Sequence, residues 1–221
     1  MSKAVVLLSG GLDSCVTAAA AAQNHEIALL HLQYRQRTEA REHEAYLSIA
    51  DHYGVPEDRR LVVDTSFLGQ IGGSALTDTD IPVPAADLDA NAVPVTYVPF
   101  RNAHLLCLAV SWAETIEAEH VYIGVVQEDS SGYPDCTAAF CEAFGKAVST
   151  GTRDGIIQIQ TPIIDRDKAA IVEYGRSLDA PLHLTWSCYD REDVACGVCD
   201  SCALRLRAFR QVGIPDPIPY A

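Results

Sequence analysis

The sequence lacks any apolar run of the roughly 18 residues that a transmembrane helix requires, which argues against a membrane-spanning protein. Basic residues are also scarce: 16 lysines and arginines stand against 30 aspartates and glutamates, giving a formal net charge of −14. Such a chain offers no basic patch for a long stretch of nucleic-acid backbone. The charge therefore argues against nucleic acid as a partner and favours a small-molecule substrate. With 48% hydrophobic residues, the composition is that of a globular protein.

No signal peptide is expected, because Met1, Ser2 and Lys3 lead directly into the first apolar segment. We therefore expect a cytoplasmic protein. In that reducing compartment, the eight cysteines are expected to form no disulfides. A length of 221 residues accommodates one α/β domain with a small appendage, and its core is large enough to need no covalent staples.

A phosphate-binding turn is predicted near the amino terminus, where an apolar strand runs into a glycine-containing turn and then an alanine-rich helix. The glycines let the backbone approach an anion, and the start of the helix presents free N–H groups. The turn is not a Walker A loop, because no Gly-Lys-Ser/Thr closes it. Its aspartate would repel phosphate unless a divalent cation bridged them, which points to magnesium-bound nucleotide. The expected nucleotide-binding residues are Leu8, Ser9, Gly10, Gly11, Leu12, Asp13 and Ser14.

Strand and helix periodicities alternate along the chain and predict an α/β fold with a doubly wound, mostly parallel sheet. Ligands of such sheets bind at the carboxyl ends of the strands, where the first turn lies. An irregular stretch over residues 67–95 interrupts the alternation. The expected strands are residues 4–8, 27–32, 60–63, 120–125 and 156–160, and the expected helices are residues 14–24, 39–53, 102–117, 137–149 and 167–178.

Four cysteines near the carboxyl terminus, Cys188, Cys196, Cys199 and Cys202, follow a C-x7-C-x2-C-x2-C pattern. Four thiolates at this spacing predict one closed, structural zinc site per chain, because no coordination position stays open. An iron–sulfur cluster is the alternative. We expect an α/β domain over residues 1–180, with residues 66–95 as an inserted loop, and a small zinc-binding helical segment over residues 181–221.

The turn over residues 9–14 resembles the signature of PP-loop ATP pyrophosphatases, which have an adenine nucleotide alpha hydrolase-like fold and cleave ATP between its α and β phosphates. Five further motifs together are similar to the 7-cyano-7-deazaguanine synthase family of queuosine biosynthesis, and the likeness covers nearly the whole chain. These motifs are residues 70–77 (QIGGSALT), 97–102 (YVPFRN), 131–136 (SGYPDC), 184–189 (LTWSCY) and 199–205 (CDSCALR).

This resemblance implies a ligase that uses ATP, with magnesium, and ammonia to convert 7-carboxy-7-deazaguanine to 7-cyano-7-deazaguanine (preQ0). Adenylation turns the carboxylate oxygen into part of a good leaving group, ammonia then gives an amide, and a second activation gives the nitrile. The sequence leaves open whether AMP or ADP is released, although the turn favours cleavage between the α and β phosphates. The family also implies a homodimer.

The resemblance further implies roles for single residues. Asp13 would bind magnesium, Lys168 would neutralise the β and γ phosphates, and Arg101 would bind phosphate or the substrate carboxylate. The alternatives are a solvated helix lysine for Lys168 and a structural ion pair for Arg101. Asp135 would accept hydrogen bonds from the base, or instead cap the helix that follows it. The expected substrate-binding residues are Gln36, Arg37, Tyr133 and Asp135.

One motif departs from the family pattern. In residues 34–38 (YRQRT), Arg35 and Thr38 stand where the family often has glycine and histidine, so no role of that histidine transfers to this chain. Near the carboxyl terminus, Arg205, Arg207 and Arg210 lie on a predicted helix and would either solvate it or close over the site and contact a second subunit.

Three other functions are compatible with parts of the sequence. A PP-loop enzyme that modifies transfer RNA would share the turn, but it should carry a basic surface or an added RNA-binding domain. A repurposed synthase that joins its activated product to a protein amine would share nearly every motif. A non-enzymatic zinc module would not need the intact turn.

Overall fold

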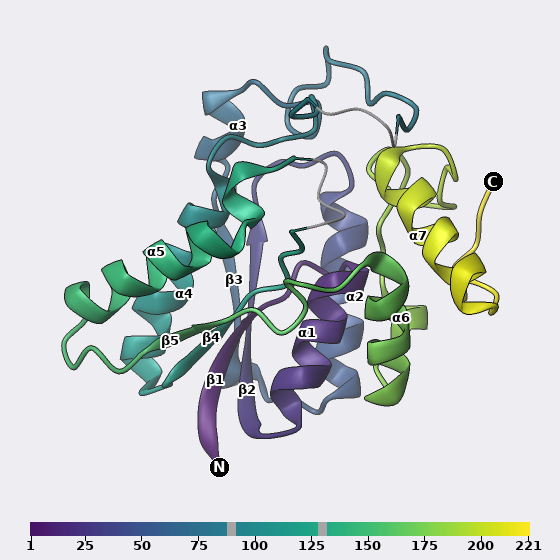
Figure 1. Cartoon of the computed structure of the whole chain (residues 1–221). Coiled ribbons are helices and arrows are strands. Elements are labelled where there is room, and N and C mark those ends of the chain that lie inside the picture. The colour runs from purple at the N-terminus through teal and green to yellow at the C-terminus, as the bar shows by residue number, and fades with distance from the viewer. Residues whose placement is uncertain (88–91, 128–131) are drawn as a thin grey trace.

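A parallel sheet with the strand order β3-β2-β1-β4-β5 runs through the computed structural model (Figure 1). The structure describes residues 1–87, 92–127 and 132–221. Both faces of the sheet are covered, so adjacent strand residues are buried together, as Val5 and Val6 are. The strands are β1 (Ser2–Leu7), β2 (His25–Gln33), β3 (Arg60–Asp64), β4 (His120–Tyr122) and β5 (Gln158–Gln160).

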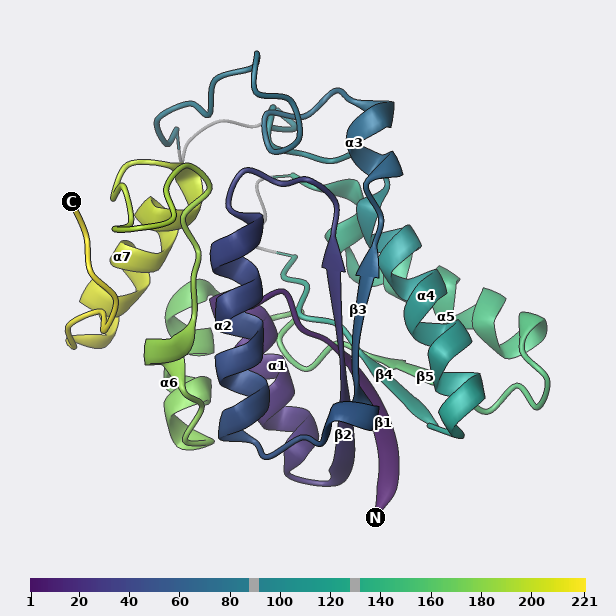
Figure 2. The same ribbon diagram turned by 180° about the vertical axis from the view of Figure 1, so that it is seen from behind.

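Helices cover the two faces of the sheet in separate layers (Figures 1 and 2). One face packs against α1 (Leu12–Ala22) and α2 (Glu39–His52), and the other against α4 (Arg101–Ile116) and α5 (Ala138–Gly151). The remaining elements are α3 (Phe67–Ile71), α6 (Lys168–Ser177), α7 (Asp200–Val212) and the short 3-10 helices η1 (Glu57–Arg59), η2 (Pro134–Cys136) and η3 (Leu182–Leu184).

The strand order reverses at β1. The chain proceeds from β1 to β2 and β3, and it then returns to place β4 on the other side of β1. The connections after β1 and β4 therefore leave the sheet on opposite faces, which opens a crevice at the carboxyl ends of these strands. Residues that follow β1 and residues that follow β4 both line the cavity described below.

Most predicted elements are present with ends shifted by a few residues, but two differ from the prediction. The strand predicted for residues 120–125 ends at Tyr122, because the chain passes directly against α1 at Gly124, where a Cβ would lie 2.8 Å from Thr17 Oγ1. The stretch predicted to be irregular contains α3, because Leu68 packs in an apolar cluster with Tyr34.

Two parts of the sequence predictions lie outside the described residues, namely residues 88–91 of the inserted loop and Ser131 of the motif over residues 131–136. The division of the chain at residue 180 stays a prediction. Among the described residues, no helix is long and apolar enough to cross a membrane.

The C-terminal segment packs on α6 and α1 through α7 (Figure 2). Arg205 of α7 is fully buried and does not solvate the helix or close over the cavity, contrary to the expectation. Its Nε and Nη2 donate to the carboxylate of Asp216 at 2.8 and 2.9 Å, and its Nη1 donates to Thr185 Oγ1 at 2.7 Å. Arg207 and Arg210 are exposed.

Candidate active site

The turn after β1 forms an anion-binding surface at the start of α1. Gly11 precedes the helix and offers no side chain to cap it, which leaves the first-turn N–H groups for a ligand. The hydroxyl groups of Ser9 and Ser14 lie 3.1 Å apart beside this end of the helix. Gly10 has a φ of 91°, and a Cβ there would lie 2.5 Å from the carbonyl oxygen of Glu42, so the close packing of α2 on the turn requires glycine.

Asp13 and Lys168 meet beside this turn, with Lys168 Nζ 2.6 Å from Asp13 Oδ2. The other carboxylate oxygen, Oδ1, is buried and has no hydrogen-bond partner among the described residues. A buried acceptor without a partner is costly, and carboxylate oxygen is the ligand that magnesium prefers. Asp13 therefore fits a bound divalent cation, with the ammonium of Lys168 close by to neutralise phosphate charge.

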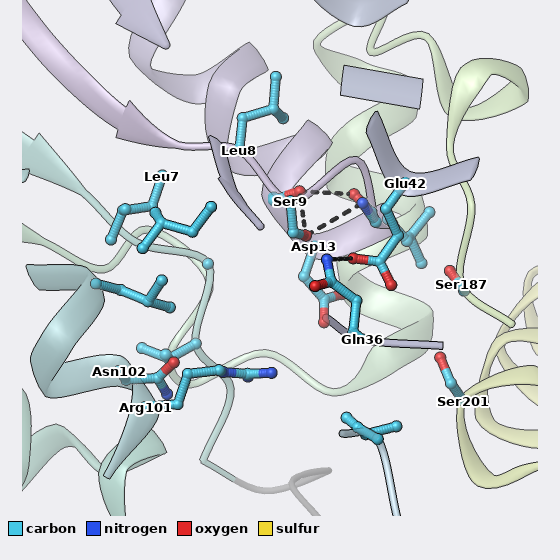
Figure 3. Close-up of a pocket in the computed structure, with 18 of the residues that line it drawn as sticks. Leu7, Leu8, Ser9, Asp13, Gln36, Glu42, Arg101, Asn102, Ser187 and Ser201 are labelled. Atoms are coloured by element: carbon cyan, nitrogen blue, oxygen red, sulfur yellow. Dashed lines mark hydrogen bonds between the residues drawn. The ribbon is translucent and has the colours of Figure 1, made fainter. Parts of the chain in front are cut away.

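A cavity of about 260 Å³ extends from this turn between the carboxyl ends of the strands and the C-terminal segment (Figure 3). Leucine, isoleucine and valine side chains, many of them from the strand ends, form its apolar part, and polar side chains from six parts of the sequence form the rest. The cavity is lined by all the residues predicted to bind nucleotide or substrate except Gly10 and Asp135, and Lys168 and Arg101 line it as well.

Arg101 begins α4, and its guanidinium extends into the cavity (Figure 3). Its Nη1 donates to the Tyr34 hydroxyl at 3.0 Å, and the guanidinium carbon lies 5.7 Å from the centre of the Tyr34 ring. No carboxylate among the described residues forms an ion pair with Arg101. The geometry therefore leaves a cation in the cavity that can bind an anionic group of a ligand.

Glu42, which the sequence analysis did not identify, lines the same cavity from the first turn of α2. Its Oε2 accepts a hydrogen bond from Gln36 Nε2 at 3.1 Å, and its Oε1 accepts one from Thr38 Oγ1 at 2.9 Å. Burial raises the pKa of the Glu42 carboxyl. The four-residue spacing of Thr38 and Glu42 could have placed these two side chains together. Nothing in the sequence indicates that they face a cavity.

Arg37 lines the cavity but uses its guanidinium to hold the inserted loop. Its Nε donates to the carbonyl oxygen of Ala75 at 2.8 Å, and its Nη2 lies 2.6 Å from that of Ile81. Two further carbonyl oxygens, of Asp78 and Thr79, accept from the same Nη2. The predicted contact of Arg37 with substrate therefore competes with a structural role that the sequence did not reveal.

Asp135 lies behind the wall of the cavity and is 3% exposed. Its Oδ2 accepts the backbone N–H of Asn102 at 2.9 Å at the start of α4. The alternative interpretation, that Asp135 caps the helix that follows it, is wrong. That helix, α5, is capped by Thr137, whose Oγ1 accepts the N–H of Phe140. Tyr133 lines the cavity, and its hydroxyl lies 2.8 Å from Thr96 Oγ1.

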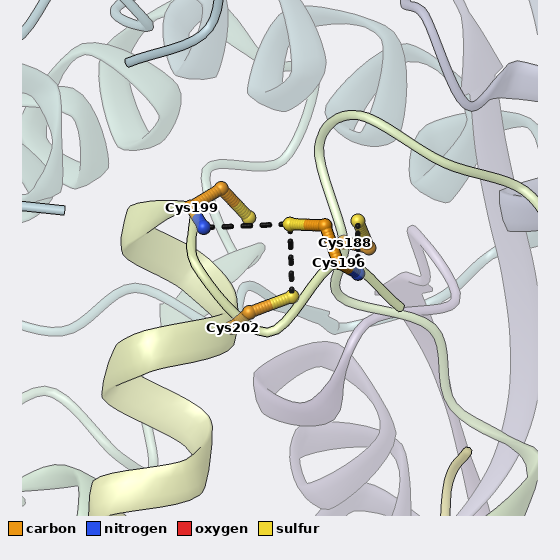
Figure 4. A group of neighbouring side chains, drawn as sticks. All are labelled: Cys188, Cys196, Cys199 and Cys202. Carbon is orange, nitrogen blue, oxygen red and sulfur yellow. Dashed lines mark hydrogen bonds between the residues drawn. The ribbon is translucent and has the colours of Figure 1, made fainter. Parts of the chain in front are cut away.

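The four C-terminal cysteines converge at the start of α7 (Figure 4), and all four Sγ atoms lie within 4.8 Å of one another. A tetrahedral ion with metal–sulfur bonds of about 2.3 Å needs sulfurs about 3.8 Å apart, so the cluster fits a bound metal ion. Backbone N–H groups of Asp190, Arg191 and Cys196 point to the Cys188 sulfur at 3.4 Å. Such donors stabilise the thiolate form that a metal requires.

The cysteine segment also supplies part of the cavity wall. Ser187, Tyr189 and Ser201, which flank the metal ligands in sequence, line the cavity. The N–H of Trp186 donates to the carbonyl oxygen of Gly10 at 2.9 Å, which fastens the segment to the anion-binding turn. A metal ion held by the cysteines would thus set the position of one side of the site.

These features define an α/β protein with an anion-binding first loop at the switch point of a parallel sheet. A model of the family described as "Queuosine biosynthesis protein QueC" matches residues 3–213, and the chain belongs to this family. The chain is 56% identical over 221 residues to the 7-cyano-7-deazaguanine synthase of Chlorobaculum parvum, covering 99% of this chain and 96% of the relative. The family and the fold class expected from the sequence are thus confirmed.

Two further relatives agree. The proteins named 7-cyano-7-deazaguanine synthase in Chlorobium phaeovibrioides and Koribacter versatilis are 57% and 56% identical to this chain. The match covers 99% of this chain in both cases, and 96% and 93% of the respective relatives.

Proposed function

We propose that this chain is a 7-cyano-7-deazaguanine synthase, a ligase that uses ATP and ammonia to convert 7-carboxy-7-deazaguanine to the 7-cyano nitrile in queuosine biosynthesis. One observation carries the proposal: among the described residues, Asp13 has a carboxylate oxygen without a hydrogen-bond partner, Arg101 has no carboxylate partner, and both residues line one cavity. A metal–nucleotide and an anionic substrate can therefore meet there. The names of relatives that are 53–57% identical support the choice of substrate.

The anion-binding turn, residues 8–14, would hold the pyrophosphate part of ATP through first-turn N–H groups and the two serine hydroxyls. Asp13 would bind a magnesium ion that neutralises the phosphates, and Lys168 would add a positive charge from the side of α6. Arg101 would bind the substrate carboxylate bidentately and hold it against the α phosphate. Gln36, Arg37 and Tyr133 line the cavity and remain predicted substrate-binding residues, whereas Asp135, which was also predicted to bind the base, is not part of the lining.

The reaction requires two activations at the same carbon. The carboxylate oxygen attacks the α phosphorus of ATP and releases pyrophosphate. Ammonia displaces AMP and loses a proton, which leaves an amide. The amide oxygen then attacks a second ATP in the same way and releases pyrophosphate, and loss of AMP together with both protons of the amide nitrogen yields the nitrile. Each step leaves the reacting carbon beside Arg101, so one cavity suffices for both activations.

The metal at the four cysteines is proposed to be a structural zinc ion, one per chain, because all four ligands are thiolates and no coordination position stays open. Free ammonia as the nitrogen donor, an assembly of two chains and a cytoplasmic location are also proposed. Of these three, the assembly of two chains is what the resemblance to the synthase family implies.

The test is to incubate the protein with 7-carboxy-7-deazaguanine, magnesium–ATP and ammonium and to follow the products by mass spectrometry. We expect the nitrile with two AMP per molecule, and a fall of roughly 100-fold in rate for Asp13→Asn, because the phosphates would lose their bound cation. Asp58→Asn, which removes an exposed carboxylate, serves as the matched control. Absence of nitrile with the unmodified protein would overturn the proposal.

A further inference from the structure

Two carboxylates line the cavity, and their surroundings differ. Asp13 pairs with Lys168 beside the anion-binding turn. Glu42 forms no ion pair with any lysine or arginine among the described residues. Arg101 attracts the Glu42 carboxylate without contacting it, and this attraction does not offset the effect of burial on its pKa. A partly buried carboxylate that contacts no cation is costly unless a ligand compensates it. Glu42 is therefore a candidate acceptor for a ligand that carries hydrogen-bond donors.

Neutral donors orient the Glu42 carboxylate without using all of its capacity. Gln36 Nε2 donates to Oε2 and Thr38 Oγ1 donates to Oε1, which leaves one acceptor position on each oxygen. Gln36 is itself fixed, because its Oε1 accepts the N–H of Tyr34 at 2.9 Å. The single hydroxyl hydrogen of Thr38 can go either to Glu42 Oε1 at 2.9 Å or to the carbonyl oxygen of Cys188 at 3.2 Å, and the shorter contact is the one to Glu42. The carboxylate is thus held in place with two parallel acceptor positions open.

Arg101 extends into the same cavity from α4, while Glu42 and Gln36 come from the side of α2 (Figure 3). A guanine-type base with a carboxylate at its 7-position carries an anion at one end. At the other end it carries two adjacent donors, the ring N1–H and the exocyclic amino group. Two parallel donors match two parallel acceptors on a carboxylate.

We propose that Glu42 reads the N1–H and amino edge of the deazaguanine, while Arg101 holds its carboxylate. This inference rests on the proposed function. It replaces Asp135 in that role, because Asp135 does not line the cavity and its Oδ2 already accepts the Asn102 N–H. Glu42 is a specificity-determining residue, and it acts on binding of the base rather than on either activation step.

The alternative is that Glu42 only fastens residues 36–38 to the start of α2. If the role of Glu42 is purely structural, replacing it should lower kcat/KM equally for all substrates. If Glu42 reads the base, replacing it should erase the preference in kcat/KM for the substrate over an analogue that lacks the exocyclic amino group. Comparing the two molecules therefore separates the roles even if the variant is less stable.

The experiment measures kcat and KM for 7-carboxy-7-deazaguanine and for the analogue without the amino group, with the unmodified protein, Glu42→Gln and Glu44→Gln. Glu44 is exposed on the same helix, and its one ion pair among the described residues is with partly buried Arg41, so its variant is the matched control. Metal content and melting temperature are recorded for each protein.

We expect the unmodified protein and Glu44→Gln to prefer the natural substrate by about 10- to 100-fold in kcat/KM. In Glu42→Gln, this preference should fall to less than about threefold, chiefly through a higher KM for the base, while the KM for ATP stays unchanged. Preserved discrimination in Glu42→Gln, or a rise in the KM for ATP alone, would overturn the inference. If the unmodified protein makes nitrile, either result leaves the proposed function standing.

Discussion

At the residue scale, Arg35 shows how this chain accommodates a departure from the family motif. Its φ is 62°, in the left-handed region that favours glycine, and glycine is the residue that the family often has there. The backbone N–H of Arg35 donates to Glu39 Oε2 at 2.7 Å, which holds the turn into α2. Its side chain is exposed. Arg35 therefore holds a left-handed backbone conformation that glycine would adopt without strain.

Arg35→Gly should raise the free energy of unfolding by about 1 kcal/mol, because relief of the left-handed strain exceeds the added entropy of a glycine in the unfolded chain. Urea unfolding at pH 7.5 measures the change. Arg35→Ala is the control, since it removes the same side chain and keeps the strain, and it should bring no gain. Equal stabilisation by alanine and glycine would show that the side chain, and not the backbone, is responsible.

At the element scale, the packing of α2 on β2 buries His31 directly beneath the anion-binding turn. His31 lies in β2, is fully buried, and its Nδ1 lies 3.0 Å from the carbonyl oxygen of Leu8. Its ring stacks on Tyr46 of α2, with ring centres 4.8 Å apart. Burial lowers the pKa of His31 to about 4. The layer beneath the turn is therefore stable only while this imidazole is neutral.

This lowered pKa predicts the sign of a pH dependence. Between pH 6.5 and about 4 the unfolded chain binds a proton at His31 that the folded chain does not, so the free energy of unfolding falls as the pH falls through this window. The loss from this residue totals roughly 3 kcal/mol. His31→Asn, which keeps a donor near Leu8, should abolish that part of the decline.

Urea unfolding between pH 7.5 and 4.5 measures the effect. Exposed His52→Asn is the control and should follow the unmodified protein, and protonation of the cysteine cluster affects all three proteins alike. Parallel declines in all three would show that His31 does not titrate in this window.

Elements of this protein were predictable from the sequence where local pattern decides them. The alanine-rich run gives α1, the apolar run before it gives β1, and cysteine spacing alone brought Cys196 and Cys199 into one cluster. Side chains whose partners are distant in sequence were not predictable. Helical periodicity places Glu42 at the start of α2 but does not show that a cavity faces it. The helix predicted around Arg205 is present as α7, but its expected solvent exposure is wrong, because Asp216 in the C-terminal tail folds back and pairs with it.

At the scale of the whole molecule, the cavity joins two parts of the chain that are stabilised differently. The sheet and its helices carry the anion-binding turn, which rests on an extensive apolar core. The opposite wall, with Ser187, Tyr189 and Ser201, belongs to a segment whose own apolar cluster is small and built largely around the cysteines. The anion-binding turn should therefore outlast this opposite wall of the cavity when the metal is lost.

Removal of the proposed zinc ion by a chelator, or by Cys196→Ser, should accordingly abolish nitrile formation while ATP affinity changes less than about threefold. The melting temperature should fall by several degrees, because a structural zinc ion contributes folding free energy to the segment it closes. Circular dichroism of the sheet and helices should stay nearly unchanged. Exposed Cys107→Ser is the matched control and should keep one zinc ion and full activity.

Together, nitrile formation, ATP affinity and melting temperature show whether the metal holds this wall of the cavity in place or has no effect on the site. Equal loss of ATP binding and nitrile formation would mean that the cysteine segment supports the anion-binding turn itself, through the backbone hydrogen bond from Trp186 to Gly10, and not only the opposite wall of the cavity. Full activity without metal would mean that the Arg205–Asp216 pair alone holds the wall. Iron and sulfide in place of zinc would identify the cluster as an iron–sulfur centre. We expect none of these, since four closely spaced thiolates fit one tetrahedral ion.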